Sequence, residues 1–184
     1  NQILHEQEIA RDLKVSEDAN ILEIGCGCGR IMESIQRETQ CNVYGINIDQ
    51  TQIDDVNNNA KKKSNNKLKL VFCDLNDRTP FKDNFFDLII CSEVLEHLDD
   101  YHAAIKEIYR VLKPAGMFLP SVPSYWPEKI CWLLSKDYQN MPGGHVRIFK
   151  KNQVINEISS YGFQYDLSER FHGLHSAYWW LRCM

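Results

Sequence analysis

The sequence lacks several features that would place a chain in a specialised class of protein. None of its apolar runs approaches the roughly 18–20 residues that a helix needs to cross a lipid bilayer, and no signal peptide is recognisable. Internal repeats and low-complexity segments are also missing. The basic run at residues 61–63 is short and the net charge is −4, so we expect no nucleic-acid partner.

The seven cysteines form no pattern that predicts a disulfide framework. Cys26 and Cys28 are separated by one residue, but no second cysteine pair or histidine pair follows at the spacing of a zinc site. Scattered, reduced thiols are typical of cytosolic proteins, so we expect a cytoplasmic protein. Because the chain begins with Asn1 rather than Met, we also expect natural residues to precede it.

The sequence does contain a regular alternation of strand-like and helix-like segments. Of its 184 residues, 43% are hydrophobic, which suits a domain with a buried core. Strands are predicted in ANILEIG, CNVYGIN, KLKLVFCD, FDLIICSE and GMFLPSV, with helices between most of them. This spacing predicts an α/β fold with a doubly wound, mostly parallel sheet, whose ligands bind outside the carboxyl ends of the strands.

Three glycines follow the first predicted strand in the stretch ILEIGCGCGR. Gly25, Gly27 and Gly29 lie between a strand and a helix, where glycine lets the backbone approach a ligand beside the helix N-terminus. The dinucleotide fingerprint G-x-G-x-x-G/A needs a small third residue, but this chain has Arg30 there. The spacing is instead G-x-G-x-G, with Glu23 two residues before the first glycine.

The stretch LEIGCGCG resembles the first motif of class I S-adenosylmethionine-dependent methyltransferases, in which an acidic residue precedes G-x-G-x-G. Four further stretches resemble that family in the same order: GINIDQTQI, VFCDLND, FDLIICSEVLEHL and EIYRVLKPAGMF. The resemblance implies a Rossmann-like sheet of the seven-stranded type, S-adenosylmethionine as cofactor and S-adenosylhomocysteine as product. Within the family, GINIDQTQI and EIYRVLKP are most similar to the sterol and ubiquinone methyltransferases.

We expect the whole chain, residues 1–184, to form a single methyltransferase domain. Residues 1–19 have the spacing of an N-terminal helix, and residues 20–122 form the cofactor-binding core. Residues 123–149 contain three prolines and two tryptophans and are expected to form a small lid over the substrate. Residues 150–184 are expected to add a helix and the strand FQYDLSERF.

The resemblance implies that side chains after the second and third strands bind the ribose and the adenine. Asn47 stands where the family usually has Asp or Glu, and Asp49 follows two residues later, so we expect the two to share the ribose hydroxyls. Asp49 is equally suited to cap the next helix. Asp74 is expected to accept from the adenine amino group, with the Leu75 N–H on the ring; a plain turn aspartate is the alternative.

The expected cofactor site extends over the loops after four strands. Glu23 is expected to orient the glycine loop or meet the amino-acid end of the cofactor, and the end of the fourth strand is expected to face the methyl donor. The complete set is Glu23, Gly25, Cys26, Gly27, Gly29, Asn47, Ile48, Asp49, Asp74, Leu75, Cys91 and Ser92.

Methyl transfer is an in-line displacement that requires an aligned acceptor, a dry site and, for a hydroxyl or acidic carbon, a base. His97 and His145 are the candidate bases. Packing on the sheet is the alternative for His97, and binding of loop backbone is the alternative for His145. Arg147 could bind an acidic group of the substrate or cover the loop.

A metal triad of His145, His172 and His175 is conceivable, but no acidic residue joins the last two at helical i, i+4 spacing, so we expect no metal site. The tryptophans have two interpretations. They fit an apolar or aromatic substrate or packing of the lid on the core; they are Trp126, Trp132, Trp179 and Trp180.

These observations favour a methyltransferase acting on a small, lipophilic or aromatic acceptor. No N/D-P-P-Y/F stretch follows the fourth strand, which disfavours enzymes that methylate amino groups of nucleic acids. Two alternatives remain open. A nicotinamide-dependent oxidoreductase is disfavoured by Arg30 and by Asp74, and a non-catalytic cofactor-binding module would keep the fold without the activity.

Overall fold

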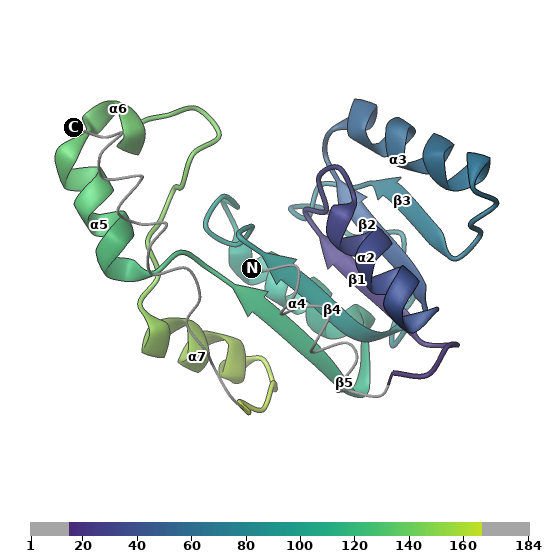
Figure 1. Cartoon of the computed structure of the whole chain (residues 1–184). Helices are drawn as coiled ribbons and strands as arrows, with labels where there is room; N and C mark the ends of the chain where they lie inside the picture. The colour runs from purple at the N-terminus through teal and green to yellow at the C-terminus, as the bar shows by residue number, and fades with distance from the viewer. Residues whose placement is uncertain (1–14, 167–184) are drawn as a thin grey trace.

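The computed structural model describes residues 15–166 of the chain, and a five-stranded parallel sheet lies at its centre (Figure 1). The strands are β1 (Asn20–Ile24), β2 (Asn42–Asn47), β3 (Leu68–Phe72), β4 (Phe86–Ser92) and β5 (Leu112–Ser121). Their order is β3-β2-β1-β4-β5, and all four neighbouring pairs are parallel. The strand order therefore reverses beside β1: β2 and β3 follow on one side of it, and β4 and β5 lie on the other side. In open α/β sheets, ligands bind outside the carboxyl ends of the strands at this point of reversal, here between β1 and β4.

Six helices accompany the sheet in the described residues, and three of them form its two outer layers. Their bounds are α2 (Arg30–Thr39), α3 (Gln50–Lys62), α4 (Tyr101–Val111), α5 (Tyr125–Leu134), α6 (Lys136–Gln139) and α7 (Lys151–Ser160). Residues of α2 and α3 belong to one apolar cluster, and residues of α4 belong to another. Helices therefore cover both faces of the sheet, which confirms the prediction of a doubly wound α/β fold.

Alternating residues of the central strands supply these two clusters. In β1, Ile21 belongs to the cluster with α2 and α3, while Leu22 and Ile24 belong to the cluster with α4. In β4, Ile90 and Cys91 divide in the same way. Strands that are buried on both faces need apolar residues at most positions, which explains the nearly continuous apolar runs of the sequence.

Two differences from the expected fold concern its extent. The described residues contain five strands, so the further strands of the seven-stranded type are not among them. The predicted N-terminal helix lies almost entirely outside the described residues. The predicted strand FQYDLSERF begins at residue 163, but residues 163–166 are irregular and the remainder lies outside the described part.

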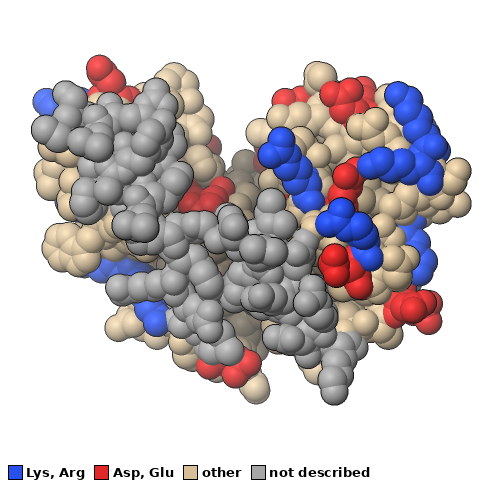
Figure 2. Space-filling view, viewed as in Figure 1, with Lys and Arg blue, Asp and Glu red and all other residues tan. Residues whose placement is uncertain are grey.

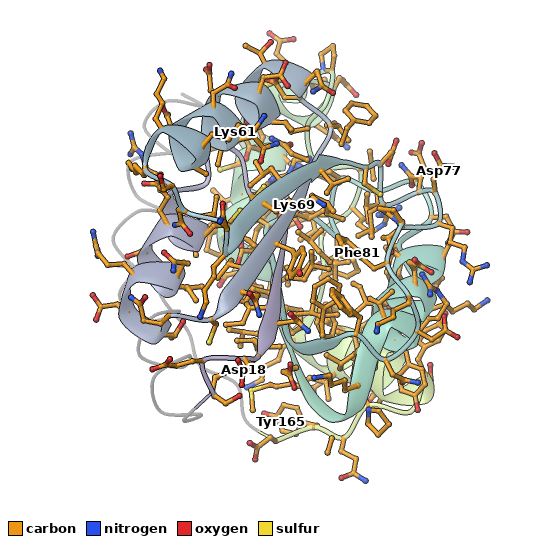
Figure 3. All side chains as sticks on the ribbon, turned by 90° about the vertical axis from the view of Figure 1, so that its right-hand side faces the viewer. Asp18, Lys61, Lys69, Asp77, Phe81 and Tyr165 are labelled. Carbon is orange, nitrogen blue, oxygen red and sulfur yellow. The ribbon has the colours of Figure 1, made fainter. Side chains whose placement is uncertain are left out.

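The carboxyl ends of the strands can be followed in Figure 3. Asp18 precedes β1 and Asp77 follows β3, and the two lie at opposite ends of the sheet. On the outer side of β2, the ring of Phe81 packs edge-to-face on Tyr44 and Phe86, with centroid distances of 5.8 and 4.8 Å. These aromatic rings close the face of the sheet beneath the segment that follows β3.

The predicted lid, residues 123–149, forms α5, α6 and the loop that leads to α7. Figure 1 shows α5 and α6 beyond the β5 side of the sheet, away from α2 and α3. Figure 2 shows a hollow between these two parts of the molecule, with acidic side chains on its wall. Within residues 15–166, no helix combines the length and apolar character required to span a bilayer.

Candidate functional site

The candidate site lies at the carboxyl edge of the sheet, where the loops after β1, β2, β3 and β4 meet. The loop after β1 is the glycine stretch, and its three glycines have left-handed backbone conformations. The φ angles are +71° at Gly25, +50° at Gly27 and +70° at Gly29. Residues with a Cβ atom rarely adopt this conformation, so the glycines are required by the backbone, as the sequence predicted.

The three glycines differ in what surrounds them. A Cβ atom at Gly25 would lie 2.5 Å from Cγ2 of Val94, and one at Gly29 would lie 3.1 Å from Cγ1 of Val56. Among residues 15–166, a Cβ atom at Gly27 would meet only Oε1 of Gln52, at 3.8 Å. Gly25 and Gly29 therefore permit close packing of the protein on itself, whereas Gly27 borders open space that a ligand can enter.

The first turn of α2 adds hydrogen-bond donors to this loop. Gly29 occupies the N-cap position, and no side chain in the described part of the chain caps the helix. The loop itself is fixed by hydrogen bonds from Gly25 N to Ile46 O, at 3.0 Å, and from Gly29 N to Cys26 O, at 2.8 Å. An uncapped helix N-terminus is suited to bind a carboxylate or phosphate, and this arrangement fits the amino-acid end of S-adenosylmethionine.

The glycine loop is seated on the core through Cys26. The Cys26 thiol is buried, and a Cβ atom at Gly45 of β2 would lie 2.7 Å from its Sγ and 2.5 Å from Sδ of Met32. Burial, together with the nearby charge of Glu23, raises the pKa of Cys26 to about 12. The Cys26 side chain is therefore a neutral packing group, and its expected contact with the cofactor would come from its backbone.

The residues after β2 form a compact polar turn. Nδ2 of Asn47 donates to Oε1 of Gln52, at 2.9 Å, and to the carbonyl oxygen of Gly27, at 3.4 Å. Oδ1 of Asp49 accepts from the backbone N–H groups of Thr51 and Gln52, at 2.9 and 3.2 Å. Asp49 is therefore the N-cap of α3, which was one of its two interpretations, and ribose binding by Asn47 and Asp49 stays a prediction.

The residues after β3 also form a polar turn, and this turn contains a candidate cofactor-binding residue, Asp74. Oδ1 of Asp74 accepts from the backbone N–H and the side-chain amide of Asn76, each at 2.9 Å. Asp74 is partly exposed, while the neighbouring Leu75 is buried. The turn role of Asp74 is thus present in the structure, and its contact with adenine stays a prediction.

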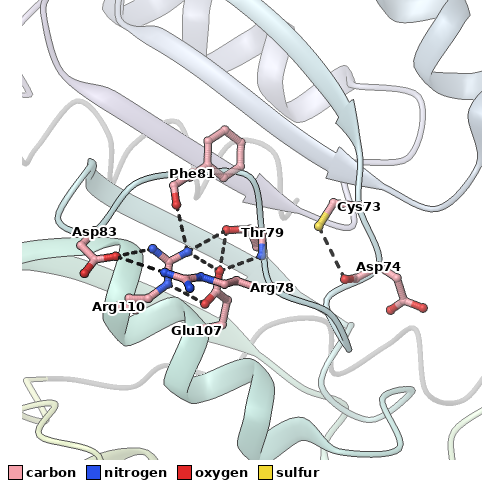
Figure 4. A network of polar contacts seen from close by, with 8 residues as sticks. All are labelled: Cys73, Asp74, Arg78, Thr79, Phe81, Asp83, Glu107 and Arg110. Carbon is pink, nitrogen blue, oxygen red and sulfur yellow. Dashed lines mark hydrogen bonds and ion pairs between the residues drawn. The ribbon is translucent and has the colours of Figure 1, made fainter.

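A charged network fixes the segment that follows this turn to α4 (Figure 4). Oε1 of Glu107 accepts from the backbone N–H and the hydroxyl of Thr79, at 2.8 and 2.7 Å. Arg110 donates to the same oxygen at 2.6 Å, to Oδ1 of Asp83 at 2.5 Å, and to the carbonyl oxygen of Phe81 at 2.9 Å. The network holds residues 79–83 in place.

The end of β4 is more deeply buried than expected for a surface that faces a methyl donor. Cys91 has no exposed surface, its side chain belongs to the apolar cluster with α4, and burial raises the pKa of its thiol. Ser92 is partly exposed. The next residue, Glu93, has a left-handed φ of +55°, and its Oε1 accepts from the hydroxyl of Ser121 at 3.2 Å.

The two candidate bases, His97 and His145, lie beside each other, with ring centroids 4.8 Å apart. Nδ1 of His145 lies 2.7 Å from Oε1 of Glu128 in α5, and its Nε2 lies 4.0 Å from Oε1 of Glu96. The hydrogen bond with Glu128 raises the pKa of His145. Sequence reasoning missed both glutamates, although Glu96 stands directly before His97 in the loop after β4.

Glu96 and Glu128 are 1% and 7% exposed, so the structure gathers two buried carboxylates and two imidazoles between α5 and the loop after β4. Burial, with the nearby charges of Glu93 and Glu128, raises the pKa of Glu96 to about 8. His172 and His175 lie outside the described residues.

Arg147 fixes the loop after β4 rather than presenting its charge to solvent. Its guanidinium donates to the carbonyl oxygens of Leu95 and Asp99, each at 2.9 Å, and to that of Leu98. The same group lies over the ring of Tyr101, 4.7 Å from the centroid. Of the two interpretations of Arg147, the structure shows the one in which it covers the loop.

Comparison of the sequence with known proteins identifies its family. The profile of a family described as "Methyltransferase domain" matches residues 22–119. The sterol 24-C-methyltransferase erg6 of Aspergillus fumigatus is 32% identical over 145 residues, which cover 78% of this chain and 36% of that protein. The 24-methylenesterol C-methyltransferase 2 of Arabidopsis thaliana is 31% identical over 147 residues, which cover 80% and 38%. The chain thus spans less than half the length of these relatives.

Solved structures share the fold at lower sequence identity. The YcgJ protein of Bacillus subtilis superposes with a TM-score of 0.77 at 21% identity, covering 97% of this chain and 77% of that one. A geranyl diphosphate methyltransferase in complex with SAM gives a TM-score of 0.68 at 17% identity, covering 84% and 64%. At this identity the likeness concerns the fold alone.

Proposed function

This chain belongs to the class I S-adenosylmethionine-dependent methyltransferases, and we propose that it transfers a methyl group from this cofactor to a small lipophilic molecule. The observation that carries the proposal is the glycine loop. Its spacing is the family's G-x-G-x-G, and Gly27 borders open space beside an uncapped helix N-terminus. The relatives named above, which act on sterols, support a lipophilic acceptor.

The residues of the carboxyl edge would hold the cofactor, which supplies an electrophilic methyl group on a sulfonium. The donors of the glycine loop and of the first turn of α2 would bind its amino-acid end. Asn47 and Asp49 would take the ribose hydroxyls, because amide and carboxylate oxygens accept hydrogen bonds. Asp74 and the backbone of Leu75 would take the adenine.

The acceptor would enter from the side of α5 and the loop after β4, where the two histidines lie. We propose His145 as the base that receives the acceptor proton, with His97 as the second candidate. Glu128 holds Nδ1 of His145, so Nε2 is the nitrogen that can receive a proton. A carboxylate on the far nitrogen also stabilises the imidazolium that results.

A lipophilic acceptor is consistent with the apolar surface of α5 and the loop after α6. Trp126 and Leu133 of α5 are 72% and 75% exposed, and Met141 and Val146 are also exposed. Trp126 and Leu133 are seven residues apart on α5 and so share a face of that helix. Exposed apolar side chains on one face are typical of an interaction site for an apolar ligand. All six cysteines of the described part are free thiols, which supports the proposal of a cytoplasmic location.

Two measurements test the proposal. Calorimetric titration should give micromolar affinity for S-adenosylhomocysteine and no binding of NADH, which distinguishes a methyltransferase from an oxidoreductase. Incubation with methyl-labelled S-adenosylmethionine should then label a sterol or quinol acceptor in an organic extract. Binding of the product without transfer to any extract fraction would indicate the non-catalytic cofactor-binding module, and absence of binding would overturn the proposal.

A further inference from the structure

We propose that Glu96, His97 and His145 bind a divalent transition-metal ion. Each of these residues offers a ligand atom, and the three atoms lie within 4.8 Å of one another. Glu96 and His97 come from the loop after β4, and His145 comes from the loop that leads to α7. The sequence led us to expect no metal, because it has no second cysteine pair or histidine pair at zinc spacing and no acidic residue that joins His172 and His175 at helical i, i+4 spacing. Glu96 and His97 are distant from His145 along the chain, so only the fold shows that they are close.

The buried state of Glu96 is the first argument for the ion. Glu96 is 1% exposed, and neither oxygen of its carboxylate has a hydrogen-bond partner among the described residues. A buried carboxylate without partners is costly, and such groups in native proteins are normally hydrogen-bonded, paired or bound to a metal. Nε2 of His145, 4.0 Å from Oε1 of Glu96, is too distant for a hydrogen bond but suitably placed for a shared ion.

The orientation of the two imidazoles is the second argument. Nδ1 of His97 lies 3.1 Å from the carbonyl oxygens of Gly143 and Gly144, which can only accept, so this nitrogen carries the proton. Nδ1 of His145 faces Oε1 of Glu128 at 2.7 Å. Both rings thus leave Nε2 as the ligand atom, and a metal-bound histidine characteristically donates its other N–H to a carbonyl or carboxylate.

The donor set indicates the class of ion. Two imidazole nitrogens and a carboxylate are typical ligands of Zn²⁺, and also of Mn²⁺, Fe²⁺ and Co²⁺, whereas Mg²⁺ and Ca²⁺ prefer oxygen ligands alone. Bonds of about 2.0–2.2 Å would require the ligand atoms to lie closer together than they do here, including the 4.0 Å between Oε1 of Glu96 and Nε2 of His145, so the side chains would move toward the ion on binding. Three protein ligands leave a further position for water or another oxygen ligand.

The surroundings carry the negative charge that a cation requires. Oε1 of Glu128 lies 2.7 Å from Nδ1 of His145, and Glu93 stands three residues before Glu96 in the loop after β4. The nearby cation Arg147 is occupied by the carbonyl oxygens of the loop and by Tyr101. A divalent ion bound to the ionised form of Glu96 would therefore have further acidic side chains close by.

Metal binding and the role of His145 as a base are alternatives for the same nitrogen, because an ion on Nε2 occupies the lone pair that would receive a proton. The metal proposal does not depend on methyl transfer, since binding of the ion is measured without cofactor or acceptor. S-adenosylhomocysteine binding, measured separately, reports on the proposed function.

The test uses the full chain without an affinity tag, treated with a chelator and then dialysed. Titration with ZnCl₂ by calorimetry is expected to show one site, and CoCl₂ is expected to give visible absorption bands of a protein-bound ion. Glu96→Gln, His97→Gln and His145→Gln should each weaken the affinity more than tenfold. Glu128→Gln, which removes the outer partner of His145, should weaken it roughly 10- to 100-fold.

His102→Gln is the matched control. His102 is an exposed histidine whose Nδ1 lies 2.8 Å from the hydroxyl of Tyr161, outside the cluster, so this variant should bind the ion like the wild type. Thermal melting and S-adenosylhomocysteine binding establish that each variant is folded. A wild-type chain that binds neither ion, or cluster variants that are folded and bind both ions with unchanged affinity, would overturn the proposal.

Discussion

Glu107 and Arg110 form an ion pair one helical turn apart on α4, with Nη2 of Arg110 2.6 Å from Oε1 of Glu107. Both side chains are largely buried, at 11% and 19% exposure. Burial alone would raise the pKa of Glu107, but the hydrogen bonds from Arg110 and Thr79 lower it overall. The pair therefore stabilises the folded state through the ionised form of Glu107.

The first prediction concerns the pH dependence of this stabilisation. A carboxyl whose pKa is lower in the folded state contributes stability above its unfolded pKa and loses it as the pH falls through the folded pKa. Glu107→Gln should lower the free energy of unfolding by about 1.5–3 kcal/mol at pH 7, and the difference from wild type should shrink below about pH 4.5. Urea denaturation at several pH values measures both effects.

Glu33→Gln is a suitable control for that experiment. Glu33 pairs with Lys63 at 3.1 Å, but both side chains are exposed, at 44% and 63%. Exposed pairs contribute little, so Glu33→Gln should change stability much less than Glu107→Gln. Equal effects of the two variants, or a Glu107→Gln effect that does not vary with pH, would contradict the role of the buried pair.

The second prediction separates backbone strain from ligand binding at Gly27. Gly27 and Gly143 both have positive φ, +50° and +74°, and both border space that a Cβ atom could occupy. Alanine at either position should cost a similar 1–2 kcal/mol of stability through the left-handed backbone. Only Gly27→Ala should weaken binding of S-adenosylhomocysteine, by tenfold or more in calorimetry, and equal affinity of the two variants would show that the cofactor does not approach Gly27.

The fold and the glycine loop could be predicted from the sequence, whereas the two buried glutamates could not. The parallel α/β fold and the need for glycine follow from local patterns, namely apolar runs, their spacing and the G-x-G-x-G stretch. Glu128 could not be identified in this way, because its partner His145 is 17 residues distant and the two meet only through the path of the lid. Nothing local in the sequence indicates that α5 and the loop before α7 bury Glu96.

The third prediction tests the two roles of Asp49. Asparagine is as good an N-cap as aspartate, whereas alanine removes the cap at a cost of about 0.5–2 kcal/mol. Asp49→Asn should therefore keep the melting temperature and, if the carboxylate binds the ribose, weaken S-adenosylhomocysteine binding about threefold or more. Asp49→Ala should lower both quantities. Unchanged affinity in Asp49→Asn would assign Asp49 to capping alone.

The fourth prediction concerns the thiols of the glycine loop. Cys28 is exposed, while Cys26 is buried with a pKa raised to about 12. Iodoacetamide at pH 8 should therefore modify Cys28 and leave Cys26 unreacted, as peptide mass spectrometry would show. S-adenosylhomocysteine should slow the reaction of Cys28. Acetylation of the lysines at the C-terminal end of α3, which is more distant from the loop, serves as a reference reaction that the ligand should not affect. An unprotected Cys28 would place the ligand elsewhere.

The close approach of Gly45 to Cys26 and Met32 has a consequence for how the site can diverge. The side chains at these three positions compete for the same space, since a single added methyl group at residue 45 would overlap both sulfur-containing side chains. Enlargement at residue 45 is therefore tolerable only with a compensating reduction at residue 26 or 32. In a collection of relatives, the residues at positions 26, 32 and 45 should therefore vary together. Residue 45, which is not expected to contact the ligand, would then govern the placement of the glycine loop, which is expected to contact it.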